Sequence, residues 1–217
     1  MKNKYIVFFD FDKTITTIDV IDDMLPRYSG NKQWMAFEKK WQDGEIGSRA
    51  CLNGQIRGLK IDKKGLNNYL AGVKLDPYFK KLLKLLDNIE AEYMILSDDF
   101  GYIIKNILNH NKISKIKLFA NKLEFSKRGL IPKFPLTDKK CRICAHCKTK
   151  SLLASVDTES IIIYIGDGRS DICPAQYANI VFAKDALLKL CREEKMPCVP
   201  FDTLKDVYVY CKKRLIC

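Results

Sequence analysis

Residues 5–16 read Y-I-V-F-F-D-F-D-K-T-I-T, and this stretch decides the fold. Its apolar, aromatic and β-branched first half predicts a fully buried strand. The strand leads into Asp10, Asp12 and Thr14 at alternate positions, beyond the carboxyl end of a strand, where open parallel sheets bind their ligands. Buried carboxylates are costly unless a cation or hydrogen-bond donors compensate, and a metal ion is the simplest partner. The alternative is a strand that ends in a turn with solvated acids, since Asp is common in turns.

Two later predicted strands also end in polar side chains. The apolar run at residues 93–96 ends at Ser97, whose hydroxyl, with the free N–H groups of the following helix, can bind an anion. A plain serine N-cap is the alternative for Ser97. The apolar run before G-D-G-R-S-D ends in Asp167 and Asp171, and Lys148 opens the predicted helix between these two strands. Because the carboxyl ends of parallel strands meet at one edge of a sheet, the sequence predicts one polar site built from all three strands.

Strands that alternate with helices predict an α/β fold with a doubly wound parallel sheet. Between the first two strands, helical apolar spacing predicts a small insertion that Pro26 and several glycines divide into short helices. Asp76 as N-cap, with Pro77 after it, marks the return of the chain to the sheet. We therefore expect a core of residues 1–16 and 77–217 with a helical cap of residues 17–76. The predicted helices cover residues 19–25, 31–42, 48–59, 62–73, 78–86, 102–108, 148–156, 185–194 and 203–214, and the later predicted strands cover residues 93–96, 116–120, 123–125, 130–134, 160–165 and 179–182.

The predicted site has the groups that phosphoryl transfer needs. Several carboxylates at one edge cannot all stay ionised without a cation, and oxygen ligands suit magnesium. Asp10 and Asp167, with a backbone carbonyl near Asp12, would leave metal positions open for water and one substrate oxygen. Such a cation, together with Lys148 and the hydroxyls, forms a pocket for a phosphoryl group. One carboxylate can attack phosphorus and a second can protonate the leaving alkoxide and then deprotonate water, and Asp10 and Asp12 provide that pair.

The chain resembles the haloacid dehalogenase superfamily of phosphatases in all four of its motifs, which occur in order as D-F-D-K-T, I-L-S-D-D, Lys148 and G-D-G-R-S-D. The resemblance implies a Rossmann-like core, an aspartyl-phosphate intermediate and Mg²⁺ as cofactor. Lys150 is the alternative for the motif lysine. The implied roles are nucleophile for Asp10, general acid and base for Asp12, phosphoryl binding for Thr14, Ser97 and Lys148, and metal binding for Asp10, Asp12, Asp167 and Asp171, the last through water or by orienting the lysine.

The insertion between the first two motifs resembles the cap of the phosphoserine phosphatase-like branch. Within it the chain is most similar to the 2-hydroxy-3-keto-5-methylthiopentenyl-1-phosphate phosphatases of methionine salvage, in T-I-T-T-I-D, the C-x-x-C-K run and the stretch from V-F-A-K-D to P-C-V-P-F. Asp19 falls where phosphoserine phosphatases place an acid that meets the substrate amine, which implies a role in specificity. An acid that complements the dipole of a helix is the alternative for Asp19. The cap arginine expected to meet the serine carboxylate has no clear counterpart near Asn53, and phosphoserine, phosphoethanolamine and phosphocholine are alternative substrates.

Cys141, Cys144 and Cys147 form a C-x-x-C-x-x-C run that encloses His146. Structural zinc prefers paired C-x-x-C arms separated by a longer loop, so three thiols this close would need a fourth ligand from His146 or elsewhere. Reduced cysteines in the loop before the lysine helix are the alternative, and a disulfide beside Lys148 could disturb the site. Nine cysteines in a core-forming chain fit a reducing compartment better than a disulfide framework, and we expect a cytoplasmic protein.

The 217 residues carry a formal net charge of +12, and 47% of them are hydrophobic. This hydrophobic content is typical of a globular protein, and no apolar run is long enough to span a bilayer. A basic surface attracts both phosphorylated metabolites and nucleic acid, so a nucleic-acid-binding module with a cysteine knuckle is a second hypothesis. The strand-end aspartates argue against that module, and a helical cap leaves room for a small molecule. We expect hydrolysis of a small phosphorylated metabolite, with transfer to an acceptor other than water as a further alternative.

Overall fold

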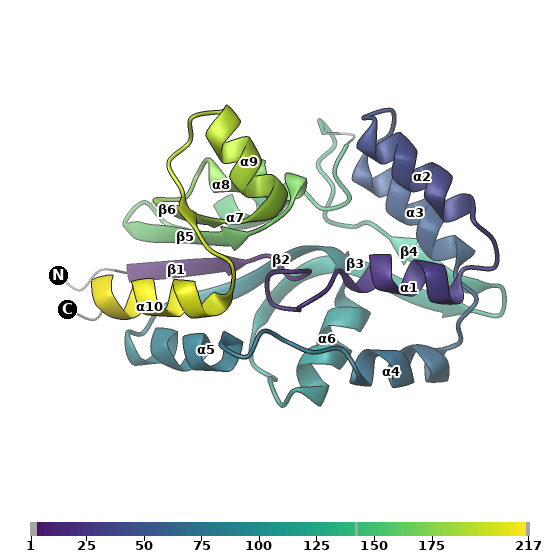
Figure 1. Ribbon diagram of the computed structural model, residues 1–217, viewed down its shortest axis with the longest axis horizontal. Helices are drawn as coiled ribbons and strands as arrows, with labels where there is room; N and C mark the ends of the chain where they lie inside the picture. Colours follow the sequence, from purple (N-terminus) through teal and green to yellow (C-terminus); the bar gives the residue numbers. More distant parts are fainter. Residues whose placement is uncertain (1–3, 142, 216–217) are drawn as a thin grey trace.

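The computed structural model describes residues 4–141 and 143–215. Within this part of the chain, a seven-stranded sheet with the order β4-β3-β2-β1-β5-β6-β7 runs through the molecule, with helices on both faces (Figure 1). No helix of this part is long and apolar enough to cross a membrane. The predicted α/β fold with a mostly parallel sheet is confirmed.

The first strand lies at the centre of the sheet. β1 (Lys4–Phe9) pairs in parallel with β2 (Glu92–Phe100) on one side and β5 (Ser160–Gly166) on the other. β3 (Lys117–Ser126) and β4 (Gly129–Lys133) form an antiparallel hairpin at one edge. Because β1 is central, both of its faces are buried, which explains why its sequence is a continuous apolar run. At the other edge lie β6 (Ile180–Ala183) and β7 (Val199–Pro200).

Alternate residues of β1 contribute to two hydrophobic clusters, one on each face of the sheet. Val7 and Phe9 belong to the larger cluster, with side chains of α5, α6 and α10. Ile6 and Phe8 belong to the smaller one, with side chains of α7, α8 and α9. This division confirms helices on both faces of a doubly wound sheet. The helices of the core are α5 (Phe79–Asn88), α6 (Gly101–His110), α7 (Lys148–Leu153), α8 (Ile172–Ala175), α9 (Asp185–Glu193) and α10 (Leu204–Arg214).

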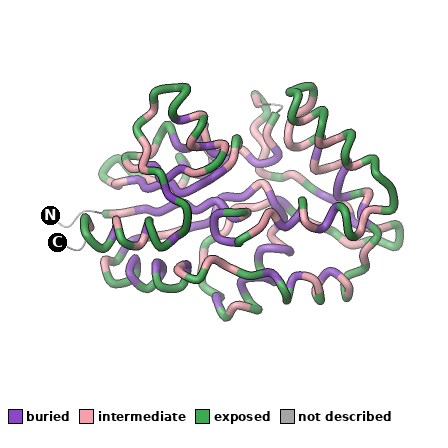
Figure 2. The backbone as a smooth tube through the Cα atoms, in the orientation of Figure 1, coloured by how far each residue is buried: buried purple, intermediate pink, exposed green. Residues whose placement is uncertain are grey.

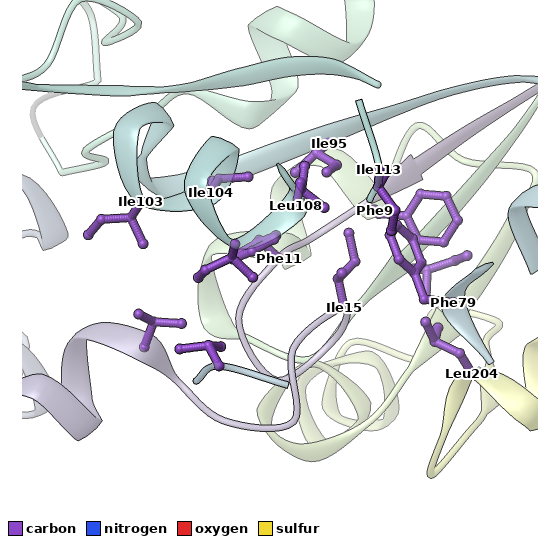
Figure 3. Close-up of a cluster of buried hydrophobic side chains, with 14 of the residues drawn as sticks. Phe9, Phe11, Ile15, Phe79, Ile95, Ile103, Ile104, Leu108, Ile113 and Leu204 are labelled. Carbon is purple, nitrogen blue, oxygen red and sulfur yellow. The ribbon is translucent and has the colours of Figure 1, made fainter. Parts of the chain in front are cut away.

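The larger cluster holds the segment that follows β1 in place. Phe11 and Ile15 are fully buried in the same cluster as Phe9, whose ring meets Phe79 edge to face at 5.5 Å (Figure 3). The backbone tube is accordingly buried along β1 and into the loop after it (Figure 2). Apolar anchors at alternating positions therefore fix the loop that carries Asp10, Asp12 and Thr14.

Four helices follow the first strand, as predicted. The first three, α1 to α3, lie beyond the carboxyl end of β1 (Figure 1). The last of them, α4, lies beside α6 of the core, where Tyr102 Oη donates to Asn67 Oδ1 at 2.6 Å. The insertion is thus also attached to the core away from the strand ends. These helices are α1 (Val20–Tyr28), α2 (Gln33–Gln42), α3 (Ser48–Gly58) and α4 (Lys63–Ala71).

The prediction that Pro26 ends the first cap helix is wrong, because α1 continues through Pro26 to Tyr28. Proline removes one backbone donor, yet Pro26 is exposed and comes near the end of the helix. Met24 and Leu25 are fully buried, so the packing of the apolar face outweighs the lost hydrogen bond.

The sequence predicts that Asp76 is the N-cap of α5, but this prediction is wrong, because the N-cap is Tyr78. The Asp76 carboxylate instead accepts from the backbone N–H groups of Tyr78 at 2.7 Å and Leu204 at 3.1 Å. It therefore links the start of α5 to the start of α10, a long-range contact that no local pattern indicates.

Two strands are longer than predicted. β2 continues past Leu96 to Phe100 with an irregular register, so Ser97 lies inside the strand and not after it. β3 is continuous over the two short strands predicted there, and the hairpin turn leads into Gly129 with a φ of +118°. Pairing with a neighbouring strand extends both elements beyond their apolar runs.

Candidate active site

The ends of β1 and β5 bring three aspartates together. Asp10 follows β1, and its N–H donates to Ile165 O of β5 at 2.9 Å. Asp167 follows β5, and Asp171 lies one turn further along. One carboxylate oxygen from each of the three lies within 4.8 Å of the others, and all three residues are buried. The strand-end acids predicted from separate parts of the sequence therefore form one group.

Lys148 completes this group from the first residue of α7. Its Nζ donates to Asp10 Oδ1 at 2.5 Å and to Asp171 Oδ1 at 2.7 Å, and only 2% of its side chain is exposed. Burial lowers the Lys148 pKa, but Asp10 and Asp171 outweigh burial and hold it well above the ordinary value. Lys150 is exposed. The residue that contacts the acids is therefore Lys148.

Asp171 is held by donors other than the lysine. Tyr164 Oη donates to Asp171 Oδ1 at 2.7 Å, and the N–H groups of Asp167 and Gly168 donate to Asp171 Oδ2 at 3.1 and 2.9 Å. A Cβ on Gly166 would lie 2.5 Å from Asp171 Oδ2, so this carboxylate requires the glycine. Asp171 thus orients Lys148 while its own position is fixed. The sequence prediction missed Tyr164, because it is one of several large residues in an apolar strand.

The aspartate group carries more negative charge than the lysine can neutralise. Burial, more than the neighbouring Asp171, raises the pKa of Asp10 well above its ordinary value and the pKa of Asp167 to about 6. Three carboxylates face one ammonium group, which leaves an excess of negative charge in a buried place. Clustered carboxylate oxygens with uncompensated charge are suited to a hard divalent cation such as Mg²⁺.

The two predicted hydroxyls lie close to the group. Thr14 is buried, and its Oγ1 donates to Asp167 Oδ1 at 3.3 Å. Lys13, with a φ of +54°, turns the chain between β1 and Thr14. Ser97 is buried and contributes to the same cavity, and its Oγ accepts from Asp99 N at 3.0 Å.

A cavity of about 660 Å³ lies above these residues and extends to the cap. Its floor includes Asp10, Ser97, Lys148 and Asp167. Its cap side combines apolar side chains with acids, which are Ile21, Trp41, Ile46 and Leu52 together with Asp19, Asp22 and Glu38. The cavity is large enough for a small metabolite.

A second set of acids lines the cavity without a lysine. Val20 N donates to Asp12 Oδ1 at 2.9 Å, which places the Asp12 carboxylate at the start of α1. Burial, followed by repulsion from Asp19 and Asp99, raises the Asp12 pKa well above its ordinary value. Among the described residues the Asp12 carboxylate does not belong to the group of Asp10, Asp167 and Asp171.

The pKa values of Asp19 and Asp99 are also raised, mainly by burial. Asp19 caps α1 by accepting from Asp22 N at 2.9 Å, and it also lines the cavity. Asp99 Oδ1 accepts from Phe100 N at 2.5 Å, whereas its buried Oδ2 has no partner among the described residues. Asp22, also on the cap, has its pKa raised to about 7 by burial and by Asp19.

His146 lies apart from the thiols that precede it in sequence. Its Nδ1 donates to Ser97 O at 3.0 Å, and its Nε2 contacts Ser151 Oγ at 2.7 Å. Burial lowers the His146 pKa to about 4, so the ring is neutral and links the Ser97 segment to α7. Cys141 and Cys144 are in contact, but among the described residues no third Cys, His, Asp or Glu ligand joins them.

Comparison with known proteins agrees with this geometry. The model of the "Putative Phosphatase" family matches residues 5–185. A 2-hydroxy-3-keto-5-methylthiopentenyl-1-phosphate phosphatase of Bacillus cytotoxicus is 25% identical over 209 residues, covering 93% of each chain, and one of Geobacillus thermodenitrificans is 26% identical over 215 residues, covering 95% of each.

Solved structures support the fold. A phosphoserine phosphatase structure described as a phospho-aspartyl intermediate analogue has a TM-score of 0.74 and 19% identity, covering 96% of this chain and 99% of its own. A substrate-bound phosphoserine phosphatase has a TM-score of 0.75 and 18% identity, covering 97% and 99%. The chain belongs to the "Putative Phosphatase" family and is a phosphatase of the haloacid dehalogenase superfamily.

Proposed function

We propose that this protein is a magnesium-dependent phosphomonoester hydrolase that acts on a small phosphorylated metabolite through an aspartyl-phosphate on Asp10. The observation that carries the proposal is the buried group of Asp10, Asp167 and Asp171 around Lys148, at the floor of a cavity that the cap helices line. A capped cavity excludes water and bulky polymers, which favours a small substrate over nucleic acid.

In this proposal Asp10 attacks phosphorus, so that a new oxygen–phosphorus bond forms as the ester bond to the leaving group breaks. Lys148, Thr14 and Ser97 hold the phosphoryl oxygens. Magnesium, held by Asp10, Asp167 and the backbone carbonyl of Asp12 with support from Asp171, would neutralise the charge of the phosphoryl group.

Asp12 acts on both halves of the reaction. Its raised pKa keeps a proton on the carboxyl group, which it gives to the leaving alkoxide. The resulting carboxylate then takes a proton from water as the water attacks the phosphorylated Asp10. A carboxyl group outside the Asp10, Asp167 and Asp171 group is suited to this double role, because Lys148 does not hold it in the ionised state.

For the substrate, we propose the methionine-salvage enolphosphate first. The support is the activity for which the relatives above are named, together with the apolar part of the cavity, where Trp41, Ile46 and Leu52 could pack a methylthio chain. The acids on the cap side favour a second candidate class, in which a cationic leaving group faces Asp19, Asp22 and Glu38. Phosphoethanolamine and phosphocholine belong to that class, as does phosphoserine through its amine.

We also propose a cytoplasmic location. The eight described cysteines are all free thiols, as expected in a reducing compartment.

Phosphate release from a panel of phosphomonoesters tests the proposal. The panel contains the methylthiopentenyl enolphosphate, phosphoserine, phosphoethanolamine, phosphocholine and an aryl phosphate, each measured with magnesium and with a chelator. We expect magnesium-dependent hydrolysis with a preference for the enolphosphate, whereas a preference for the amines would select the second class. Absence of hydrolysis by the folded protein would contradict the proposal and favour transfer to another acceptor or the nucleic-acid-binding hypothesis.

A further inference from the structure

A pair of cysteines lies at the rim of the cavity and takes no part in the proposed reaction. Cys141 and Cys144 both line the cavity and are partly exposed, and their Sγ atoms are 3.7 Å apart. We call residues 143–147 together with Cys141 the rim loop. A shift of less than 2 Å would bring the two sulfurs to the bonding distance of about 2.05 Å.

The two thiols of the pair differ in reactivity. The N–H groups of Cys144 and Ile143 donate to Cys141 and lower its pKa below the ordinary value. Burial raises the Cys144 pKa to about 12. A thiol with a lowered pKa beside one with a raised pKa is the arrangement in which one sulfur reacts first with an oxidant and the other then attacks it.

The rim loop connects the cap to the core. Arg49 N donates to Ile143 O at 3.4 Å, and Ala145 N donates to Ser48 Oγ at 2.8 Å. The Ile143 backbone packs so closely on the start of α3 that a Cβ on Gly47 would lie 2.2 Å from Ile143 O. A movement of Cys144 toward Cys141 would therefore shift the neighbouring Ile143 and Ala145, which contact the start of α3.

The core side of the same loop meets the strand that carries Ser97. His146 N donates to Asp98 Oδ1 at 3.2 Å, and Ser48 Oγ donates to Asp98 Oδ2 at 3.2 Å. Cys147, the last residue of the loop, is the N-cap of α7 and precedes Lys148. The rim loop thus touches both the cap and two segments of the phosphate-binding floor.

We propose that Cys141 and Cys144 form a reversible oxidation site whose disulfide switches the phosphatase off. A hydroperoxide supplies the oxidising equivalents. The Cys141 thiolate attacks the terminal oxygen of the hydroperoxide, and the oxygen–oxygen bond breaks. The departing oxygen takes a proton and leaves as water or alcohol. The Cys144 thiol then attacks the sulfenic acid on Cys141, which forms the disulfide and releases water, so two electrons pass from two thiols to one peroxide. A dithiol reverses the reaction.

Other residues distinguish this pair from a structural feature or a zinc site. Cys191 also contacts a second thiol, that of Cys198, but Cys191 is fully buried and neither thiol lines the cavity. His146 is engaged with Ser97 and Ser151, and no third ligand joins Cys141 and Cys144 among the described residues. The environment of the pair therefore fits disulfide chemistry better than metal binding.

The test treats the magnesium-loaded full chain with hydrogen peroxide and measures two quantities. Peptide mass mapping without reduction locates the disulfide, and hydrolysis of an aryl phosphate gives the activity of the oxidised relative to the reduced protein. We expect a Cys141–Cys144 bond and an activity that falls about tenfold, which corresponds to about 1.4 kcal/mol in the activation barrier, and that returns with dithiothreitol.

Each variant is compared with its own reduced form. Cys141→Ser and Cys144→Ser should lose the response to peroxide, and Cys173→Ser, which changes a neighbouring thiol, should keep it. Three results would overturn the proposal: a bond to Cys147 or Cys173 instead, a Cys141–Cys144 bond that leaves activity unchanged, or stoichiometric zinc on the reduced protein that blocks oxidation. The effect on activity rests on the proposed function, but the mapping does not, so a protein inactive on every substrate is separable from a failed oxidation site.

Discussion

Two groups of acids share one cavity and have opposite surroundings. The inner set is Asp10, Asp167 and Asp171, which surrounds Lys148 and receives further hydrogen bonds from Tyr164 and backbone N–H groups. The outer set is Asp12, Asp19 and Asp99, which accepts from backbone N–H groups, and to which no ion pair extends among the described residues.

The surroundings of the two sets determine which acids are suited to which chemistry. Burial favours the neutral form of every carboxyl group in the cavity, but the inner set has a cation that opposes this effect. Lys148 favours the ionised forms of Asp10 and Asp167, which suits acids that attack phosphorus and bind a metal. Lys148 does not oppose this effect at Asp12 and Asp99, and the raised pKa values of these two acids suit donation to a leaving group and hydrogen bonding to a substrate.

The largest effect is expected for the nucleophile of the inner set. Asp10→Asn keeps the size of the side chain but removes the attacking carboxylate, so turnover should fall by roughly four orders of magnitude or more. Initial rates on an aryl phosphate measure the loss, and circular dichroism with a thermal melt serves as the control for folding. Retained turnover in a folded Asp10→Asn protein would sink the covalent mechanism.

The cation of the inner set comes next. Lys148→Ala leaves buried carboxylates without their partner and should lower the free energy of unfolding by about 3–5 kcal/mol, together with a loss of activity. Lys150→Ala is the matched control, because Lys150 is exposed on the same helix and should change stability by no more than about 0.5 kcal/mol. Urea unfolding with and without magnesium measures both. Equal effects of the two substitutions would mean that the inner set does not depend on Lys148.

The sequence pointed to the inner set and to Asp12 and Asp19 of the outer set, but not to Asp99. Asp10, Asp167 and Asp171 follow apolar strands, and parallel pairing brings such strand ends together whatever lies between them. Lys148 was predictable only as the lysine of a motif, because its ion pair with Asp10 joins residues far apart in the chain. Asp99 had no local signal, because β2 continues past its apolar run and buries the residue.

The fold was predictable for the same reason as the inner set. Apolar runs indicated β1, β2 and β5, whose burial on both faces leaves little choice of structure. Long-range contacts determined what the sequence prediction missed, as at Asp76, which joins two helices, and at β7, which has two residues and no pattern of its own.

An isosteric change in the outer set should affect stability in a pH-dependent way. The folded-state pKa of Asp99 lies well above its value in an unfolded chain, so wild-type stability falls as the pH rises through that interval, because the folded state holds the proton more tightly. Asp99→Asn keeps the acceptor for Phe100 N and cannot ionise. The variant should match the wild type near pH 4 and be more stable by about 1–3 kcal/mol at pH 8.

Urea unfolding of both proteins across this pH range provides the measurement. A stability difference between the two proteins that does not change with pH would show that Asp99 does not lose a proton on unfolding. Asp99 would then not be a buried acid with a raised pKa.

The smallest effect is expected at the cap. Asp19→Ala should alter the preference among phosphomonoesters more than the hydrolysis of an aryl phosphate, because Asp19 lines the cavity and is not among the residues proposed to hold the phosphoryl group. It should also cost about 1 kcal/mol of stability through the lost helix cap. Asp19→Asn is the control that keeps a capping oxygen without the charge. An equal loss on all substrates in both variants would place Asp19 in the structure and not in recognition.

The most direct test of the division between the two sets is to locate the phosphoryl group during turnover. Rapid acid quench followed by borohydride reduction converts a phosphorylated aspartate to homoserine, which peptide mass mapping identifies. We expect homoserine at Asp10 in the presence of magnesium and substrate, and none in the Asp10→Asn variant. Homoserine at Asp12 or Asp167, or its absence from every aspartate during active turnover, would contradict the assignment of the nucleophile.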